Sequence, residues 1–468
     1  MLFNSLHFLL FLPVVVAIYY LLPMRYRWML IFVASCYFYM AFVPAYILIL
    51  FFIILVDYVS AILIERSEGK KRKLFLIGSL LANILLLCFF KYFNFINANL
   101  VTVFGWVGKD FHPINLNILL PIGLSFHTFQ SMSYTIEVFK GKQKAEKHLG
   151  YFANYVLFFP QMVAGPIERY EHLGNELKKG QSPLYENFSN GFRLILFGLF
   201  VKMAIADNLA PYINQIYEAP FKYSSPEVLL AVVLFSFQIY ADFYGYSTIA
   251  VGCARLLGIR IMDNFNTPYL SKSIGEFWSR WHISLSTWFR DYLYIPLGGN
   301  RVALFRWSLN ILIVFMVSGL WHGASWTFVV WGALHGCVLL AERYFSLLFK
   351  FKADEAKGIL RALLVFKTFM LSSFIWIFFR ATDFANAKDM IKALLFNWHL
   401  PSTGPVFGSA IFFMLVLFVS DMLLYNSRVD TRLAPLKIYY RWAVYTLLLF
   451  GLMALSGTQK LAFIYFQF

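Results

Sequence analysis

The stretch that decides the fold runs from residue 307 to residue 341 and reads WSLNILIVFMVSGLWHGASWTFVVWGALHGCVLLA. It contains no Asp, Glu, Lys or Arg, but it contains two histidines, His322 and His335. A membrane-spanning helix needs roughly 20 mostly apolar residues. The stretch is therefore long enough for two spans, and its histidines are expected at membrane depth, where ionisable residues suggest a functional site.

The composition of the whole chain extends this interpretation. The 468 residues are 60% hydrophobic, 20% aromatic and only 14% charged, whereas soluble domains average about 45–50% apolar and about 25% charged residues. A soluble globular enzyme and a disordered chain are both excluded. The apolar residues suffice for about ten or more spans, so we predict one all-α, polytopic membrane protein.

The net charge of +16 has a membrane explanation. The basic residues lie mainly in short hydrophilic connections between apolar runs, as the positive-inside rule expects. Membrane lipid is therefore the expected partner, and nucleic acid is not.

The topology of the first part of the chain follows from its charges. Residues 1–24 are uncharged and Arg25 and Arg27 follow them, so we expect a retained first span with its N-terminus outside. The uncharged run 28–56 is interrupted at Pro44, which predicts a hairpin. Beyond the basic cluster 66–73, we expect an outward span, an external loop and a returning span, at residues 74–90, 91–117 and 118–139.

The pattern degrades between about residues 149 and 301, where charged residues interrupt shorter apolar runs: Glu168, Lys202, Asp207, Asp242 and Arg255. Charges at membrane depth are costly unless they face a water-filled cavity or a partner. Broken or re-entrant helices around a cavity would explain the pattern, and so would amphipathic helices in the membrane interface. Asp242 is a lower-ranked site candidate. Further spans are expected at 363–379, 406–420 and 442–456.

A second histidine motif lies in residues 277–292. Trp278, Trp281, Leu285, Trp288 and Tyr292 recur at helical spacing, which predicts one helix with an aromatic face. His282 lies beside that face, and residues 296–300 (PLGGN) end the helix with a turn. Plain packing of the stripe and a functional role for His282 are both open.

His322 is the leading candidate for a general base, because an imidazole titrates near neutral pH. Gly319 and Gly323 form a GxxxG pattern that brings helix backbones together, so a packing histidine is the alternative. His335 lies 13 residues further on, about 220° around a continuous helix. It therefore shares no narrow cavity with His322 unless the helix breaks, and it ranks lower. His127 is expected to be a core histidine.

Other chemistries receive little support. The chain has no G-x-S-x-G, no H-E-x-x-H, no P-loop lysine motif and no dinucleotide fingerprint. Its four cysteines have no paired spacing, and neither histidine has a ligand cluster near it in the sequence. We therefore expect no metal and no tightly bound cofactor, and cofactor-binding residues stay unassigned.

Several motifs occur together and in order: PIGLSF at 121–126, FPQMVAGPI at 159–167, QIYADFYGYS at 238–247, WFRDYLYIPLGGNR at 288–301, and the two histidine motifs. With them, the chain resembles the membrane-bound O-acyltransferases (MBOATs). The branch that it resembles most is the membrane subunit of alginate-type polysaccharide O-acetyltransferases, and the D-alanyl transfer protein of teichoic acid is a more distant relative. The resemblance is strongest over about residues 118–341.

The resemblance implies a fold of about eleven or more helices, some of them re-entrant or interfacial, around a transmembrane tunnel. It implies that His322 is essential and that His282 lines the tunnel with it. Acetyl-CoA or a similar thioester would be the donor substrate, entering from the cytoplasm of a bacterial inner membrane. A periplasmic hydrolase-like partner would complete transfer to a cell-surface or secreted polysaccharide.

We predict three parts in the sequence: N-terminal hairpins at 1–117, a catalytic core at 118–345, and C-terminal helices with an aromatic tail at 346–468. Two other functions remain open. The chain could be a transporter of polymer or lipid, although no internal repeat is visible, or a non-catalytic scaffold for a periplasmic transferase.

The tail carries the last prediction. Basic residues precede the span 442–456, so the C-terminus is expected outside. The tail FIYFQF at 463–468 is either an interfacial aromatic belt or a segment folded back into the external tunnel mouth. In the second case Tyr465 would accept the acyl group and pass it on as a tyrosyl ester.

Overall fold

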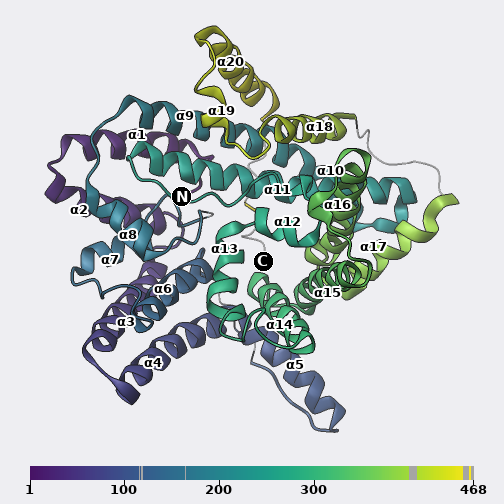
Figure 1. Ribbon diagram of the computed structural model, residues 1–468, viewed down its shortest axis with the longest axis horizontal. Helices are drawn as coiled ribbons and strands as arrows, with labels where there is room; N and C mark the ends of the chain where they lie inside the picture. Colours follow the sequence, from purple (N-terminus) through teal and green to yellow (C-terminus); the bar gives the residue numbers. More distant parts are fainter. Residues whose placement is uncertain (115, 117–119, 164, 400–407, 457–462, 465–468) are drawn as a thin grey trace. The chain divides into compact units, whose positions relative to one another are not determined.

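The computed structural model (Figure 1) describes residues 1–114, 116, 120–163, 165–399, 408–456 and 463–464. Within these ranges the regular elements are all helical. Seven helices are long and apolar enough to cross a membrane, and two shorter apolar helices, Leu6–Leu21 and Gly408–Leu423, accompany them. The predicted all-α polytopic fold is confirmed.

The chain forms two compact units. The first unit contains Met1–Gly191 and Ala250–Met262, and the second contains Phe192–Ile249 and Asp263–Phe468. The predicted division of the sequence into three functional parts stays a prediction.

The first unit contains α1 (Leu6–Leu21), α2 (Met24–Met40), α3 (Ile47–Arg66), α4 (Gly69–Leu87), α5 (Phe93–Trp106), α6 (Leu124–Phe139), α7 (Leu149–Leu157) and α8 (Tyr170–Lys179). In this unit α3, α4 and α6 pack together, and α7 packs against α2, α3 and α8. The predicted hairpin at Pro44 is confirmed, because a short 3₁₀ turn, Pro44–Tyr46, separates α2 from α3. Proline suits this place because the first turn of a helix needs no N–H donor there.

The predicted external loop at 91–117 is wrong over most of its length. A π-helical turn, Cys88–Tyr92, carries α4 directly into α5, so that Gly69–Trp106 forms one continuous helical stretch. Residues 93–106 contain no charged side chain, and the π turn adds one residue around Lys91 without ending the helix. The low charge of this segment therefore reflects a helix.

A buried carboxylate joins three helices of the first unit. Asp57 on α3 accepts hydrogen bonds from Ser79 (2.5 Å) and Asn83 (3.0 Å) on α4, and from Ser131 on α6. Its side chain is completely buried within a candidate span. The three neutral donors compensate the loss of solvation that burial of this acid would cause.

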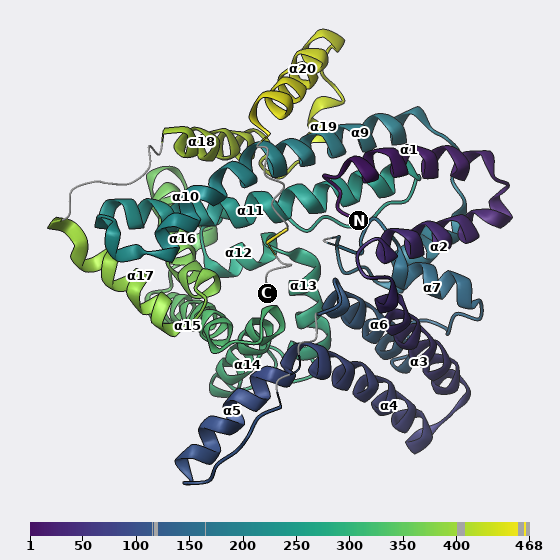
Figure 2. The same cartoon turned by 180° about the vertical axis from the view of Figure 1, so that it is seen from behind.

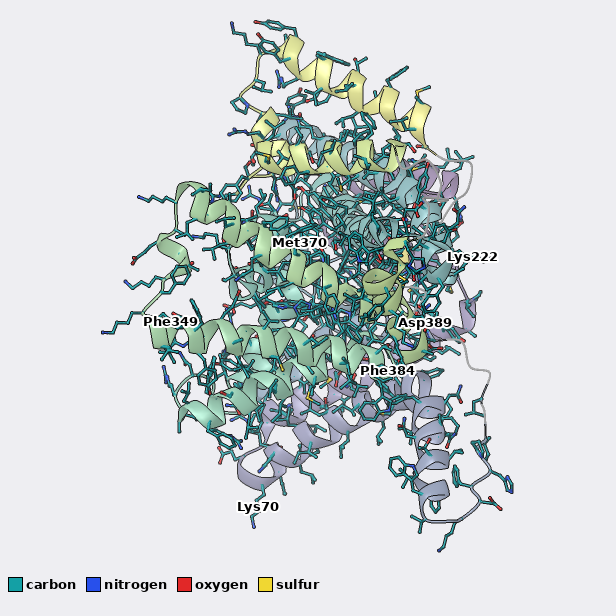
Figure 3. All side chains as sticks on the ribbon, turned by 90° about the vertical axis from the view of Figure 1, so that its right-hand side faces the viewer. Lys70, Lys222, Phe349, Met370, Phe384 and Asp389 are labelled. Carbon is teal, nitrogen blue, oxygen red and sulfur yellow. The ribbon has the colours of Figure 1, made fainter. Side chains whose placement is uncertain are left out.

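The second unit (Figures 1 and 2) holds the remaining helices: most of α9 (Tyr185–Leu199) and α11 (Ser225–Leu256), then α10 (Asp207–Glu218), α12 (Ile274–Arg280), α13 (Ile283–Phe289), α14 (Leu304–His322), α15 (Trp326–Phe349), α16 (Gly358–Arg380), α17 (Phe384–Phe396), α18 (Gly408–Leu423), α19 (Val429–Leu433) and α20 (Ile438–Leu455). Figure 3 shows Phe349 at the end of α15, Met370 within α16, and Phe384 at the start of α17.

The stretch with interrupted apolar runs contains two of the longest candidate spans, Tyr185–Glu218 with 34 residues and Ser225–Leu256 with 32. Lys202 forms ion pairs with Asp207 and Asp242. These three charged residues therefore compensate one another, as charges at membrane depth require. They do not shorten the helices that carry them.

Two helices, α14 and α15, occupy the stretch 307–341 with a break at residues 323–325, and α14 is one of the seven helices that are long and apolar enough to cross a membrane. Glycine explains how closely they pack. A Cβ atom at Gly319 would lie 2.1 Å from the carbonyl oxygen of Phe328, and one at Gly332 would lie 2.1 Å from that of Phe315. The two backbones are thus in contact where only glycine fits.

Candidate active site

The aromatic stripe predicted as one helix is broken at His282. Helix α12 ends at Arg280, α13 begins at Ile283, and His282 between them has φ of 43°, in the left-handed region. Asn264 holds the break, because its carbonyl oxygen accepts from the Ile283 N–H (2.9 Å) and its side-chain oxygen from the Ser284 hydroxyl (2.6 Å). These local bonds replace the bonds of a continuous helix.

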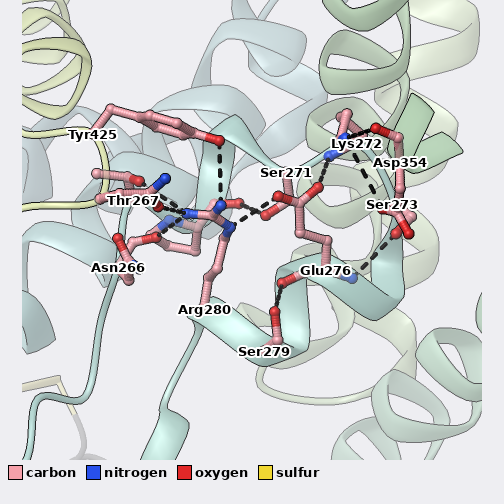
Figure 4. A network of polar contacts seen from close by, with 12 residues as sticks. Asn266, Thr267, Ser271, Lys272, Ser273, Glu276, Ser279, Arg280, Asp354 and Tyr425 are labelled. Atoms are coloured by element: carbon pink, nitrogen blue, oxygen red, sulfur yellow. Dashed lines mark hydrogen bonds and ion pairs between the residues drawn. The ribbon is translucent and has the colours of Figure 1, made fainter. Parts of the chain in front are cut away.

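Polar contacts fix α12 in front of this break (Figure 4). Arg280 donates to Glu276 (3.0 Å), to the carbonyl oxygen of Asn266 (3.1 Å) and to the Tyr425 hydroxyl (3.2 Å). Glu276 also accepts from the Lys272 N–H at 2.8 Å. Helix α12 is therefore hydrogen-bonded to residues that precede it in the sequence, Asn266 and Lys272, and to Tyr425, which follows it. These bonds fix the end of the helix next to His282.

His282 is fully buried, with aromatic rings next to its own. The edge of its ring faces Phe243, with ring centroids 4.7 Å apart, and Trp321 lies 6.3 Å away. Burial lowers the pKa of His282 to about 3, because a charged imidazolium would lose its hydration. At neutral pH His282 is thus a neutral imidazole, which acts through a hydrogen bond and carries no charge.

His322 is the last residue of α14 and is 5% exposed. Its ring contacts Trp321, Trp331 and Phe379, at centroid distances of 5.0, 5.1 and 5.4 Å. The C-terminal end of a helix favours a nearby positive charge. This position therefore suits a histidine that takes up a proton during a reaction.

His335 was expected to lie near His322 only if the helix between them breaks, and it does break between α14 and α15. Both rings contact Trp331, each with a centroid distance of 5.1 Å. His335 is buried, and its ring lies parallel to that of Phe277 and nearly perpendicular to that of Trp278. Neither ring nitrogen of His335 has a hydrogen-bond partner within the described part of the chain.

Three histidines of the second unit, His282, His322 and His335, are therefore linked through two tryptophan rings. Trp321 lies between His282 and His322, and Trp331 lies between His322 and His335. A buried aromatic wall excludes water and offers flat apolar contact. The arrangement suits a reaction that water would spoil.

Two site candidates remain, Asp242 and Tyr465, and the structure describes only the first of them. Asp242 is buried and accepts a hydrogen bond from the backbone N–H of Ile464 at 2.6 Å. Tyr465 lies outside the described residues. Phe463 and Ile464 are both buried, as the folded-back alternative for the tail requires, whereas an interfacial belt would expose them.

His127 belongs to the first unit. It is buried, and its Nδ1 lies 2.9 Å from the carbonyl oxygen of Val156. This is the core histidine that the sequence predicted.

Sequence reasoning missed several residues that shape the site. Asn264 stands in a loop without any motif, and no signal in a single sequence indicates that it holds the break at His282. Trp331 and Trp376, whose rings are 5.5 Å apart, look like ordinary apolar residues of spans. The break that brings His322 and His335 to the same ring was detectable, because Ser325 accepts from the Thr327 N–H as an N-cap.

Comparisons with known proteins bear on this site. A model of the MBOAT, membrane-bound O-acyltransferase family matches residues 73–382. A protein of Azotobacter vinelandii named "Probable alginate O-acetylase AlgI" is 39% identical over 402 residues, which cover 84% of this chain and 78% of the relative. A "Peptidoglycan O-acetyltransferase" of Helicobacter pylori is 34% identical, over 77% of this chain and 72% of its own length. A "Teichoic acid D-alanyltransferase" of Bacillus subtilis is 28% identical, over 62% and 72%.

Proposed function

Because the chain belongs to the membrane-bound O-acyltransferase family, as its motifs predicted, we propose that it moves an acetyl group across a bacterial inner membrane for O-acylation of a polysaccharide. The donor in this proposal is acetyl-CoA or a similar cytoplasmic thioester, and the acceptor is a cell-surface or secreted polymer. Two relatives named for O-acetylation of alginate and of peptidoglycan support the acetyl group and the polysaccharide acceptor.

The observation that carries the proposal is the placement of His322. It is buried among Trp321, Trp331 and Phe379 at the C-terminal end of α14. In the proposed step a ring nitrogen of His322 takes the proton of the acceptor hydroxyl while the oxygen attacks the thioester carbonyl. The carbon–sulfur bond then breaks, and the departing thiolate takes the proton from His322.

His282 has a different role in this step. Because burial keeps it neutral, it donates or accepts a hydrogen bond and adds no charge. We assign it to the thioester carbonyl, where a donor stabilises the negative charge that develops on the oxygen. The surrounding aromatic rings exclude water and so limit hydrolysis of the donor.

The acceptor at His322 need not be the polymer itself, because a polymer is too bulky for a closed site. Phe463 lies 5.6 Å from Phe243, whose ring is also in contact with His282. Tyr465 follows two residues later, so we propose it as the hydroxyl that receives the acetyl group. A periplasmic hydrolase-like partner would then transfer the group from the tyrosyl ester to the polysaccharide.

The decisive experiment is acetyl transfer by the purified protein in nanodiscs with labelled acetyl-CoA. His322→Ala should abolish consumption of the label, while His172→Ala, on the partly exposed helix α8, should retain it. Normal consumption by His322→Ala would overturn the assignment. A transporter or a scaffold would consume no donor in either form.

The relay is tested separately with an acceptor polymer and candidate partners. Tyr465→Phe keeps the ring and removes the hydroxyl, so polymer acetylation should be lost, and Phe468→Leu should be milder. If Tyr465→Phe acetylates polymer at the normal rate, the tyrosine is no relay.

A further inference from the structure

A buried polar network in the second unit places one basic side chain against two acidic ones. Lys202 lies 2.7 Å from Asp207 and also pairs with Asp242. The side chains are 2%, 9% and 4% exposed, respectively. One ammonium group therefore serves two carboxylates in a place where an uncompensated charge is costly. Further donors to these oxygens are favourable.

Local backbone structure places Lys202 against α11. The π-helical turn Phe200–Ala206 interrupts the stretch that joins α9 to α10, and such turns often mark functional places. A Cβ atom at Gly245 would lie 2.8 Å from the carbonyl oxygen of Gly198 and 2.9 Å from the backbone nitrogen of Lys202. Two glycines thus let the helices touch, which brings Lys202 within reach of Asp242.

The additional donor comes from a segment far away in the sequence. The backbone N–H of Ile464 donates to Asp242 Oδ2 at 2.6 Å, while Lys202 occupies the other carboxylate oxygen. The ring of Phe463 lies 4.8 Å from Tyr246 and 5.6 Å from Phe243. In Figures 1 and 2 this short yellow segment lies beside α11.

Asp242 and Phe243 are consecutive residues of α11, and each contacts a different part of the 463–464 segment. Asp242 holds the backbone of the 463–464 segment, and Phe243 contacts both the Phe463 ring and the His282 ring. A charge-assisted hydrogen bond to a carboxylate is about twice as strong as a neutral one. The bond therefore fixes which residue of the segment lies at this height of α11.

We propose that Asp242, held by Lys202, is a docking anchor that seats the chain's own 463–464 segment beside His282. Asp242 is in this view a positioning residue and not a general base. Its ligand is a backbone amide next to an aromatic side chain, and the rings of Tyr246 and Phe243 select that side chain. The role of the docked segment rests on the proposed function, whereas the docking does not.

The anchor predicts protection of a single amide from solvent. Hydrogen–deuterium exchange of the peptide that carries Ile464, measured in nanodiscs, should show slow exchange in the parent protein. Asp242→Ala should raise the exchange rate of that amide at least about tenfold. Asp242→Asn should give a smaller increase because its amide oxygen still accepts. Asp421→Asn is the matched control, since Asp421 is a buried acid of the same unit that accepts from Tyr240 instead.

A second variant removes the donor without disturbing the ion network. Ile464→Pro has no backbone N–H at this position, whereas Ile464→Ala keeps it. Acetyl transfer to polymer should fall in Ile464→Pro and in Asp242→Ala, and the double variant should be no worse than the more damaging single one. Losses that multiply, or unchanged exchange at Ile464 in a folded Asp242→Ala protein, would overturn the anchor.

The two proposals fail in different ways. If the tyrosyl relay is wrong, Tyr465→Phe transfers acetyl groups normally, yet the Ile464 amide is still protected and still exposed by Asp242→Ala. If the anchor is wrong, that amide is indifferent to Asp242, whatever Tyr465→Phe does to transfer.

Discussion

The two units each bury an aspartate on a long helix but satisfy it with different partners. In the first unit Asp57 receives hydrogen bonds from Ser79, Asn83 and Ser131, neutral side chains on two neighbouring helices. In the second unit Asp242 pairs with Lys202 and receives a bond from the backbone of Ile464. The first arrangement is complete within a helix bundle, whereas the second depends on a segment more than two hundred residues away. A polar group at membrane depth is therefore structural or functional according to its partners.

The histidines give the largest expected contrast between the units. His322→Ala should lower acetyl transfer per folded molecule by about 10² to 10⁴, the usual contribution of a general base. His127→Ala should lower stability but leave transfer per folded molecule normal, because its bond to Val156 lies in the core of the first unit. Labelled donor consumption per folded molecule, with thermal unfolding in the same nanodiscs, checks both. Equal activity losses in the two variants would remove the contrast.

Asp57→Ala is expected to cost about 3 kcal/mol in the free energy of unfolding, because three buried donors lose their acceptor. Activity per folded molecule should stay normal. Asp57→Asn keeps an acceptor and should cost less. Thermal unfolding followed by transfer assays separates the two effects, and a stable but inactive Asp57→Ala protein would make the first network functional.

Gly332→Ala tests the helix contact that positions His322 and His335. Its new Cβ would meet the Phe315 carbonyl oxygen at 2.1 Å, so α14 and α15 must separate at a cost of about 1–3 kcal/mol. Gly78→Ala is the control, because nothing lies within 4 Å of a Cβ placed there. A Gly332→Ala protein as stable and active as the parent would show that this close contact is dispensable.

The pH dependence of stability should have opposite signs for two histidines. The hydrogen bond with Glu168 raises the pKa of His172 in the first unit, so its contribution is complete below about pH 6.5 and lost as pH rises through the folded pKa. Burial lowers the pKa of His282 to about 3, so stability falls as pH drops below about 6.5. Unfolding between pH 5 and pH 8 should lose the first slope in His172→Asn and the second in His282→Asn. The reverse assignment of slopes would contradict the two environments.

The sequence predicted the membrane class, the break at Pro44 and the span at α14, because each depends on local charge and apolar length. The sequence-based prediction was wrong where a residue distant in the sequence determines the local structure. The helix 277–292 has a flawless spacing, yet Asn264 breaks it at His282. The loop at 91–117 failed for the opposite reason, since a π turn lets the helix continue past a lysine. Lys202 was noticed as a charge at membrane depth, but its partner Asp242 lies on another helix, where a single sequence cannot place it.

The left-handed backbone conformation of His282 limits which amino acids this position accepts, whatever the chemistry of the site. At φ of 43°, glycine is unstrained, and asparagine, aspartate and histidine are the side chains that adopt this region most readily. Of these four, only histidine and asparagine have a neutral side chain with an N–H donor. A library with all twenty amino acids at position 282 should therefore yield two functional residues, histidine and asparagine. Most of the other residues would be excluded by the backbone conformation alone, independently of the substrate.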